Sequence, residues 1–181
     1  MIITDKYIFF WKENPFCNFT KCKIKFEYPD SRPGEEIYFT SSEQMFMWFK
    51  AKFFLDTETA NKILDAKTPE EARKLGRQVK NYSDSAWDRE RVYYMTKAVT
   101  AKFLQNKDLR KQLINPEYDG KHFVEAAYYD RIWGIGFNEN DALLHNESEW
   151  GRNALGKILD AVRIKCIELD KLIDDLELEE K

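Results

Sequence analysis

Cysteine and histidine are scarce in this chain of 181 residues, which holds three Cys and two His. The three thiols are Cys17, Cys22 and Cys166. Residues 1–11 carry charge early and lack the long apolar run of a secretion signal. A small, odd number of cysteines in a chain without such a signal is typical of proteins in the reducing cytosol. We therefore expect a cytoplasmic protein.

Metal and nucleophile motifs are missing as well. His122 and His145 lie far apart, and the pair Cys17-x4-Cys22 has no second pair of ligands. A structural zinc site needs four nitrogen or sulfur ligands. Neither histidine lies near a nucleophile motif, and the chain has no GxxxxGK[ST] or GxGxxG sequence. The sequence predicts no metal and no cofactor.

Long hydrophobic runs and a strong charge bias are also absent. No window holds the roughly eighteen apolar residues that a membrane-spanning helix needs. With 29 basic and 32 acidic residues, the net charge is −3. That balance disfavours broad affinity for duplex nucleic acid, although a local basic pocket for a few phosphates stays possible.

Aromatic residues, in contrast, make up 15% of the chain. One stretch, Tyr129 to Phe137, combines Asp130, Trp133, Gly134 and Gly136. Glycines let a backbone turn sharply and approach a ligand, and a tryptophan offers a flat face. The stretch favours a small-molecule pocket, without naming a reaction. The alternatives are a turn residue for Asp130 and a core residue for Trp133.

The length predicts one domain, with short N-terminal strands followed by helices. The expected strands lie at 7–11, 23–28 and 36–39, between Pro15, Pro29, Pro33 and Gly34. The capping box Thr40-Ser41-Ser42-Glu43 predicts a helix that ends at about Leu55, and further capping sequences predict helices from Thr68 to Gly76 and from Ser83 or Ser85 to about Asn106. Further on we expect a helix at 108–114, a short strand or extended segment at 122–127, and a last helix from Ser148 or Asn153. The fold class is mainly α, a single compact helical domain with a few short N-terminal β-strands.

Glu43 and Lys50 are seven residues apart in the first predicted helix. Seven residues are two turns, so both side chains point to about the same face. An acid and an amine on one apolar-rich face, shared with Met47 and Phe54, shift each other's pKa. The alternative is a helix-cap glutamate and a surface lysine.

Several blocks of residues, in this order and spacing, resemble the YbiA-like N-glycosidase family, also called NADAR. They are Phe16-Cys17-Asn18-Phe19, Ser41 to Gln44, Lys50 to Phe53, Leu75-Gly76-Arg77, Trp87 with Arg91 and Met95, Lys102-Phe103, Val124 to Ala126 with Asp130, Trp133 to Gly136, and Trp150 to Lys157. The resemblance covers residues 8–164. Cys17 stands where the family's Ser-Asn-Phe element has serine, which puts the N-terminal rim of the site in doubt.

The resemblance implies a mostly helical domain, which we place at residues 1–165, and the acidic C-terminal helix extension expected at 166–181 lies outside it. It implies hydrolysis of an N-glycosidic bond without a metal. The family's substrates are ribosylamino-pyrimidine phosphate intermediates of riboflavin synthesis, or ADP-ribose attached to guanine. We expect Glu43, Lys50 and Asp130 to be catalytic. The residues expected to bind substrate are Asn18, Trp87, Arg91, Trp133, Gly134, Gly136 and Asn153.

Cleavage of a ribosyl C–N bond builds positive charge on the sugar, which a carboxylate can stabilise while it activates water. Lys50 would form a Schiff base with an opened ribose, or contact a phosphate or hydroxyl as a cation. Trp87 or Trp133 would stack on the base. Arg77, Arg91 and Arg152 are candidates for a phosphate clamp, or are ordinary surface or ion-paired arginines.

ADP-ribosylated guanine, in nucleic acid or as a nucleotide, is the expected substrate because no pathway enzyme is fused to the chain. The riboflavin intermediates are the alternative substrate. Two other functions stay open. One is a module that binds ADP-ribose or a nucleotide without turnover, and the other is a structural or partner-binding role using the acidic C-terminal helix. We expect no membrane partner, and the sequence leaves the oligomeric state open.

Overall fold

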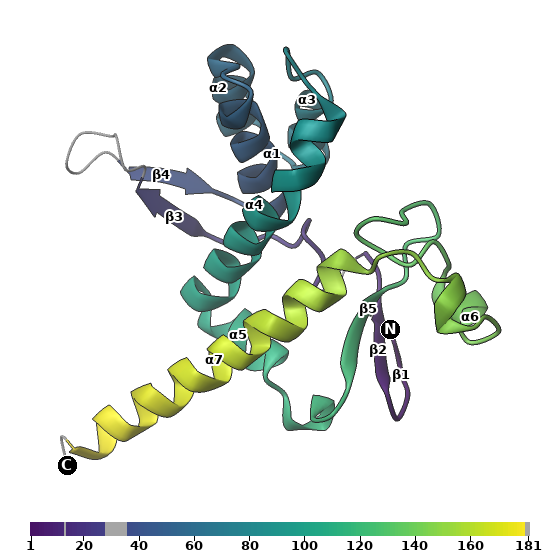
Figure 1. Cartoon of the computed structure of the whole chain (residues 1–181). Helices are drawn as coiled ribbons and strands as arrows, with labels where there is room; N and C mark the ends of the chain where they lie inside the picture. Colours follow the sequence, from purple (N-terminus) through teal and green to yellow (C-terminus); the bar gives the residue numbers. More distant parts are fainter. Residues whose placement is uncertain (13, 28–35, 180–181) are drawn as a thin grey trace. The chain divides into compact units, whose positions relative to one another are not determined.

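The computed structural model describes residues 1–12, 14–27 and 36–179. Pro29, Pro33 and Gly34, which the sequence places between two strands, lie outside these residues. The chain divides into two compact units. Residues 18–106 form the helical unit, and residues 1–17 with 107–181 form the sheet unit. Helices dominate both units, so the mainly α fold class is confirmed (Figure 1).

The helical unit contains α1 (Ser42–Phe53), α2 (Thr57–Asp65), α3 (Pro69–Gly76) and α4 (Asp84–Gln105), with a hairpin of β3 (Ile24–Glu27) and β4 (Glu36–Phe39). The hairpin is antiparallel, with Ile24 opposite Phe39. Helix α1 packs against the other three helices of the unit. Because α1 is central, eight of its twelve residues are buried, and they include polar Ser42, Glu43 and Gln44.

The predicted helix starts of this unit are confirmed by their caps. The cap of α1 is Ser41, one residue after the Thr40 that opens the predicted capping box, and its hydroxyl accepts a hydrogen bond from the Gln44 amide. The Thr68 hydroxyl accepts one from the Glu71 amide, as predicted. Of the two serines proposed for α4, Ser83 is the cap. Each hydroxyl satisfies one of the amides that a helix start leaves without an intrahelical partner.

Helix α2 was not predicted. Its cap is Asp56, whose carboxylate accepts a hydrogen bond from the Thr59 amide. Leu55, just before it, has a positive φ of 58° that separates α2 from α1. Leucine seldom adopts this backbone conformation, so the sequence gives little sign of a break between two helices at this point.

The sheet unit is built on three strands in the order β1 (Ile2–Ile3), β2 (Tyr7–Phe10) and β5 (His122–Glu125). Strands β1 and β2 are antiparallel, whereas β2 and β5 are parallel, with Phe10 opposite Glu125. The predicted strand after residue 122 is therefore confirmed, although it joins an N-terminal strand across more than a hundred residues. A core of Phe9, Val124, Ala126, Ile135 and Ala142 forms beside it.

Helices complete the sheet unit. They are α5 (Lys107–Leu113), α6 (Glu139–Ala142) and α7 (Ala154–Glu179), with the 3₁₀ turns η1 (Pro116–Tyr118) and η2 (Glu147–Glu149). Helix α7 packs on β5 and on α5. It follows Asn153, one of its two predicted starts, and runs unbroken past residue 166, where the sequence places the beginning of a C-terminal extension. Among the described residues, no helix has the length and apolar character needed to cross a membrane.

Candidate active site

The start of α1 brings two of the predicted site residues together. The Glu43 amide donates a hydrogen bond to the carbonyl oxygen of Asn18 at 3.1 Å. The Ser42 hydroxyl donates to the same carbonyl at 3.2 Å and lies 3.1 Å from the Asn18 side-chain oxygen. Both Asn18 and Glu43 are buried. Glu43 thus places a buried carboxyl group in the first turn of α1, beside amides that a helix start leaves without intrahelical partners.

Lys50 lies two turns further along α1, where it contacts groups from α3 and the segment after it. Its ammonium donates a hydrogen bond to the Gly76 carbonyl at 2.9 Å and sits 4.2 Å from the centre of the Tyr82 ring. Burial lowers the pKa of Lys50, and the positive charge of Arg91 lowers it further, while Asp84 acts in the opposite direction. Lowering this pKa increases the fraction of neutral amine, the form that attacks a carbonyl carbon.

Arg91 is buried on α4 and has acidic neighbours on the same helix. Its guanidinium lies 3.3 Å from a carboxylate oxygen of Asp84 and 3.3 Å from one of Asp88. Two carboxylates already face this guanidinium, so a phosphate would have to compete with them. Binding of a substrate phosphate by Arg91 stays a prediction.

Trp87 lies within a group of aromatic rings from α1 and α4. Its ring stacks on Tyr94 at an interplanar angle of 17°, with centroids 5.6 Å apart. Phe46 and Phe53 pack against it at 5.3 and 5.8 Å. Trp87 is 4% exposed. The Trp87 ring therefore packs against side chains of α1 in the interior of the helical unit. Its stacking on a substrate base stays a prediction.

The sheet unit holds the other predicted residues, beginning with Asp130. One of its carboxylate oxygens accepts hydrogen bonds from the amides of Ile132 and Trp133, at 2.8 and 2.9 Å. These bonds form a turn in which the side chain replaces a backbone acceptor. The second oxygen makes no hydrogen bond to the described residues, which leaves it available to a ligand. That Asp130 shares a pocket with Glu43 and Lys50 stays a prediction.

Gly134 and Gly136 are needed by the path of this loop. A Cβ on Gly134 would lie 2.7 Å from the Glu125 carbonyl oxygen, and Gly136 has a φ of +77°. The first position has no room for a side chain, and the second has a backbone conformation that favours glycine. The loop is thereby held against the end of β5, which fixes the direction in which Asp130 and Trp133 project.

Asn153 extends the hydrogen bonding of β5 with its side chain. Its amide oxygen accepts from the Glu125 backbone at 3.0 Å, and its amide nitrogen donates to the Phe123 carbonyl at 2.9 Å. Asn153 has a positive φ of 47°, which asparagine tolerates better than most residues. The side chain thus ties the start of α7 to the sheet, and a direct contact with substrate stays a prediction.

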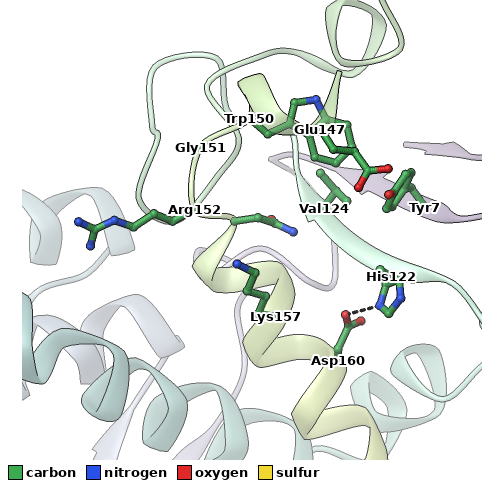
Figure 2. A pocket seen from close by; sticks show the side chains of 10 residues that line it. Tyr7, His122, Val124, Glu147, Trp150, Gly151, Arg152, Lys157 and Asp160 are labelled. Carbon is green, nitrogen blue, oxygen red and sulfur yellow. Dashed lines mark hydrogen bonds and ion pairs between the residues drawn. The ribbon is translucent and has the colours of Figure 1, made fainter. Parts of the chain in front are cut away.

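A pocket of about 460 Å³ opens on the sheet unit beside Asn153 (Figure 2). Its other lining residues are Tyr7, His122, Val124, Glu147, Trp150, Gly151, Arg152, Lys157 and Asp160. The His122 imidazole lies 2.9 Å from the Asp160 carboxylate. Burial is the main cause that raises the pKa of Tyr7 to about 12, and a hydrogen bond with Glu147 adds to it.

Sequence reasoning missed this pocket, because its residues come from four separate segments of the chain. His122 and Asp160 are 38 positions apart, and no local pattern joins them. Figure 2 shows Arg152 pointing to the opposite side from Tyr7 and His122. Across residues 1–12, 14–27 and 36–179, no three potential metal-binding side chains gather in one place.

Comparison with known proteins gives consistent matches. The family model described as the NADAR domain matches residues 9–166. An N-glycosidase of Acanthamoeba polyphaga mimivirus is 36% identical over 169 residues, which cover 88% of this chain and 96% of that protein. A riboflavin biosynthesis protein of Vibrio vulnificus is 31% identical over 136 residues, 75% of this chain but 33% of that protein. The NMR structure of YbiA from E. coli matches with a TM-score of 0.68 at 26% identity, covering 94% of this chain and 90% of that one.

Proposed function

Since the chain belongs to the NADAR family and is an N-glycosidase, we propose that it removes ADP-ribose from ADP-ribosylated guanine. The observation that carries the proposal is the pair on α1. Glu43 offers a buried carboxylate at the helix start, and Lys50 offers an amine of lowered pKa. A proton donor and a nucleophilic amine together suit cleavage of an N-glycosyl bond by way of an opened ribose.

Glu43 acts first as a general acid. It protonates the ring oxygen of the ribose as the ring opens, and the resulting iminium joins C1 of the ribose to the nitrogen of guanine. Ionised Glu43 then stabilises the positive charge of that iminium. A carboxyl group can perform both roles, because it donates a proton while it is protonated and opposes a positive charge once it is ionised.

The Lys50 amine then replaces guanine at C1 of the ribose. Its neutral amine adds to C1, and the C1–guanine bond breaks as the nitrogen of guanine takes a proton and departs. The product is an imine between C1 and Lys50. Water, activated by Glu43, adds to this imine and releases the amine, and the aldehyde closes to ADP-ribose. One water molecule is consumed, and Lys50 is regenerated.

The second candidate substrate is a ribosylamino-pyrimidine phosphate. It is favoured by the match to the riboflavin biosynthesis protein of Vibrio vulnificus. The same two residues would cleave its C–N bond by the same steps. The two substrates differ in the base and in the group on the ribose. The protein would therefore distinguish them by the contacts that bind these groups and not by the steps that cleave the C–N bond.

A direct assay compares both substrates. Purified protein is incubated with an ADP-ribosylated guanine nucleotide and, separately, with a ribosylamino-pyrimidine phosphate, and released products are measured by mass spectrometry. The same reactions run in the presence of EDTA, which should leave turnover unchanged. We expect free ADP-ribose and unmodified guanine nucleotide. Turnover of the pyrimidine substrate alone would instead assign the chain to the second candidate.

A further inference from the structure

Tyr82 lies directly beside the Lys50 amine, within the same compact unit of residues 18–106. The Lys50 ammonium sits over the Tyr82 ring, 4.2 Å from the ring centre. Lys50 is half-buried, whereas Tyr82 is 43% exposed. One part of the ring therefore covers the amine, and another part is open to solvent and can meet a ligand.

The Tyr82 ring is held in place from several sides. Its hydroxyl donates a hydrogen bond to the Asp84 carboxylate at 2.7 Å, and the Phe54 ring packs edge-on against it with centroids 5.3 Å apart. The segment that carries Tyr82 is anchored by the Lys80 amide, which donates to the Asp56 carboxylate at 2.8 Å. Because the ring is already fixed, binding a ligand against it costs little additional ordering.

The Tyr82 hydroxyl is uncharged at neutral pH. Burial raises its pKa, and the hydrogen bond with Asp84 raises the pKa further. The ring therefore offers a neutral aromatic face next to a cationic or neutral amine. Flat, neutral rings are the side chains on which nucleobases stack.

Trp87 presents a contrasting case in the same unit. Its ring is 4% exposed, stacks on Tyr94 and packs against Phe46. A base could reach the face of Trp87 only after these side chains had separated. Tyr82 offers an open ring surface without such a rearrangement, and it does so beside the amine.

The chemistry of Lys50 brings the base of the substrate close to this ring. In the proposed reaction the Lys50 nitrogen bonds to C1 of the ribose, at about 1.5 Å, and the base leaves from the same carbon. While both are attached, the departing nitrogen of the base lies within about 2.5 Å of the amine. The Tyr82 ring, centred 4.2 Å from that amine, is therefore within reach of the base before it departs.

We propose that Tyr82 is a substrate-binding residue, and that the base of the substrate stacks on its exposed ring before the C–N bond breaks. The proposal rests on the proposed function for the position of C1 at Lys50. Stacking on an aromatic side chain depends little on which base is present. The same ring would therefore hold guanine or the pyrimidine of the second candidate substrate, and it contributes affinity without deciding between them.

The first experiment replaces the ring and measures KM for an ADP-ribosylated guanine nucleotide. Tyr82→Leu keeps apolar bulk but removes the flat face, whereas Tyr82→Phe and Tyr82→Trp keep a ring. The matched control is Tyr93→Leu, because Tyr93 on α4 is 54% exposed and also has a lysine over its ring, Lys97 at 4.8 Å. Circular dichroism verifies that each variant is folded.

We expect Tyr82→Leu to raise KM about tenfold, since it removes one base–ring stack. Tyr82→Phe and Tyr82→Trp should stay within about threefold of the wild type, because each keeps an aromatic face. The control should match the wild type. An unchanged KM in Tyr82→Leu would overturn the proposal. So would an equal rise in Tyr82→Leu and Tyr82→Phe, which would assign the effect to the hydroxyl and Asp84.

The pH profile separates stacking from an indirect effect through Lys50. Arg91, Asp84 and Arg77 act on the pKa of this amine and remain in Tyr82→Leu. If Tyr82 served only to hold the amine, replacing the ring would shift the rising limb of kcat/KM and leave KM unchanged. That result would refute stacking, whereas a raised KM that Tyr82→Trp restores supports it.

A binding measurement separates this proposal from the proposed function. Isothermal titration calorimetry is carried out in the Glu43→Gln background, with and without Tyr82→Leu, using the ADP-ribosylated guanine nucleotide and the ribosylamino-pyrimidine phosphate in turn. Tyr82→Leu should weaken binding of the substrate about tenfold. If the wild type turns over only the pyrimidine compound and Tyr82→Leu weakens binding of that compound, the proposed guanine substrate is wrong and the role of Tyr82 stands. Binding of both compounds that does not depend on the ring, or no binding of either, would overturn the proposal.

Discussion

The Lys50 ammonium donates its hydrogen bond to the carbonyl of Gly76, 2.9 Å away and 26 residues further along the chain. Gly76 is the last residue of α3, and a Cβ there would lie 2.1 Å from the Met47 sulfur. The absence of a side chain therefore lets α3 lie close to α1. This close packing partly buries the Lys50 amine, and burial is the main cause of its lowered pKa.

The pH dependence of the reaction should report the pKa of Lys50. Only the neutral amine attacks, so kcat/KM should rise with pH through that pKa. Asp84 raises the pKa of Lys50. Removing its charge with Asp84→Asn should lower this pKa further and shift the rising limb to lower pH. If the rising limb stays in place or moves to higher pH in Asp84→Asn, the pH dependence of kcat/KM does not report the pKa of Lys50.

Glu43→Gln should keep the fold and lose activity. The change is nearly isosteric, and Ser41 still caps α1, so unfolding by urea should be close to that of the wild type. Turnover should fall by about 100-fold or more if the residue transfers a proton. Glu70→Gln is the matched control, because Glu70 is likewise the second residue of its helix but is exposed. Near wild-type activity in Glu43→Gln would remove Glu43 from catalysis.

Asn153→Ala should act mainly on stability. The substitution leaves the Glu125 amide and the Phe123 carbonyl without their side-chain partners. Each group left unsatisfied costs about 1–3 kcal/mol when buried, and alanine also tolerates the positive φ poorly. We expect a lower free energy of unfolding, measured with urea, and little change in KM at a temperature where the variant is folded. An unchanged unfolding midpoint with a raised KM would show instead that Asn153 contacts substrate.

Local signals in the sequence predicted much of the fold. Helices begin at Thr68 and Ser83 as predicted, because a hydroxyl side chain can accept a hydrogen bond from an amide three residues further along the chain. Helix α1 is capped by Ser41, one residue after the predicted Thr40. The break between α1 and α2 was missed because it depends on the unusual backbone of Leu55. Tertiary packing, which no local pattern encodes, fixes that conformation.

The candidate site was harder to predict than the fold. Helical spacing placed Glu43 and Lys50 on one face, but it could not show that Gly76 and Tyr82 contact the amine. The flat face expected of Trp87 stacks on Tyr94, and the Asn153 side chain bonds to β5. Sequence identifies residue types suited to a reaction, whereas their partners depend on long-range contacts.

Trapping of Lys50 with borohydride tests the central claim most directly. Borohydride added during turnover of ADP-ribosylated guanine should reduce the imine to a stable amine, and peptide mass spectrometry should find the ribose adduct on Lys50. Lys50→Arg keeps the charge but cannot form the imine, so it should be inactive and unlabelled, whereas Lys52→Arg on the same helix should be labelled like the wild type. Full activity of Lys50→Arg, or turnover by the wild type with no adduct on Lys50, would contradict the account.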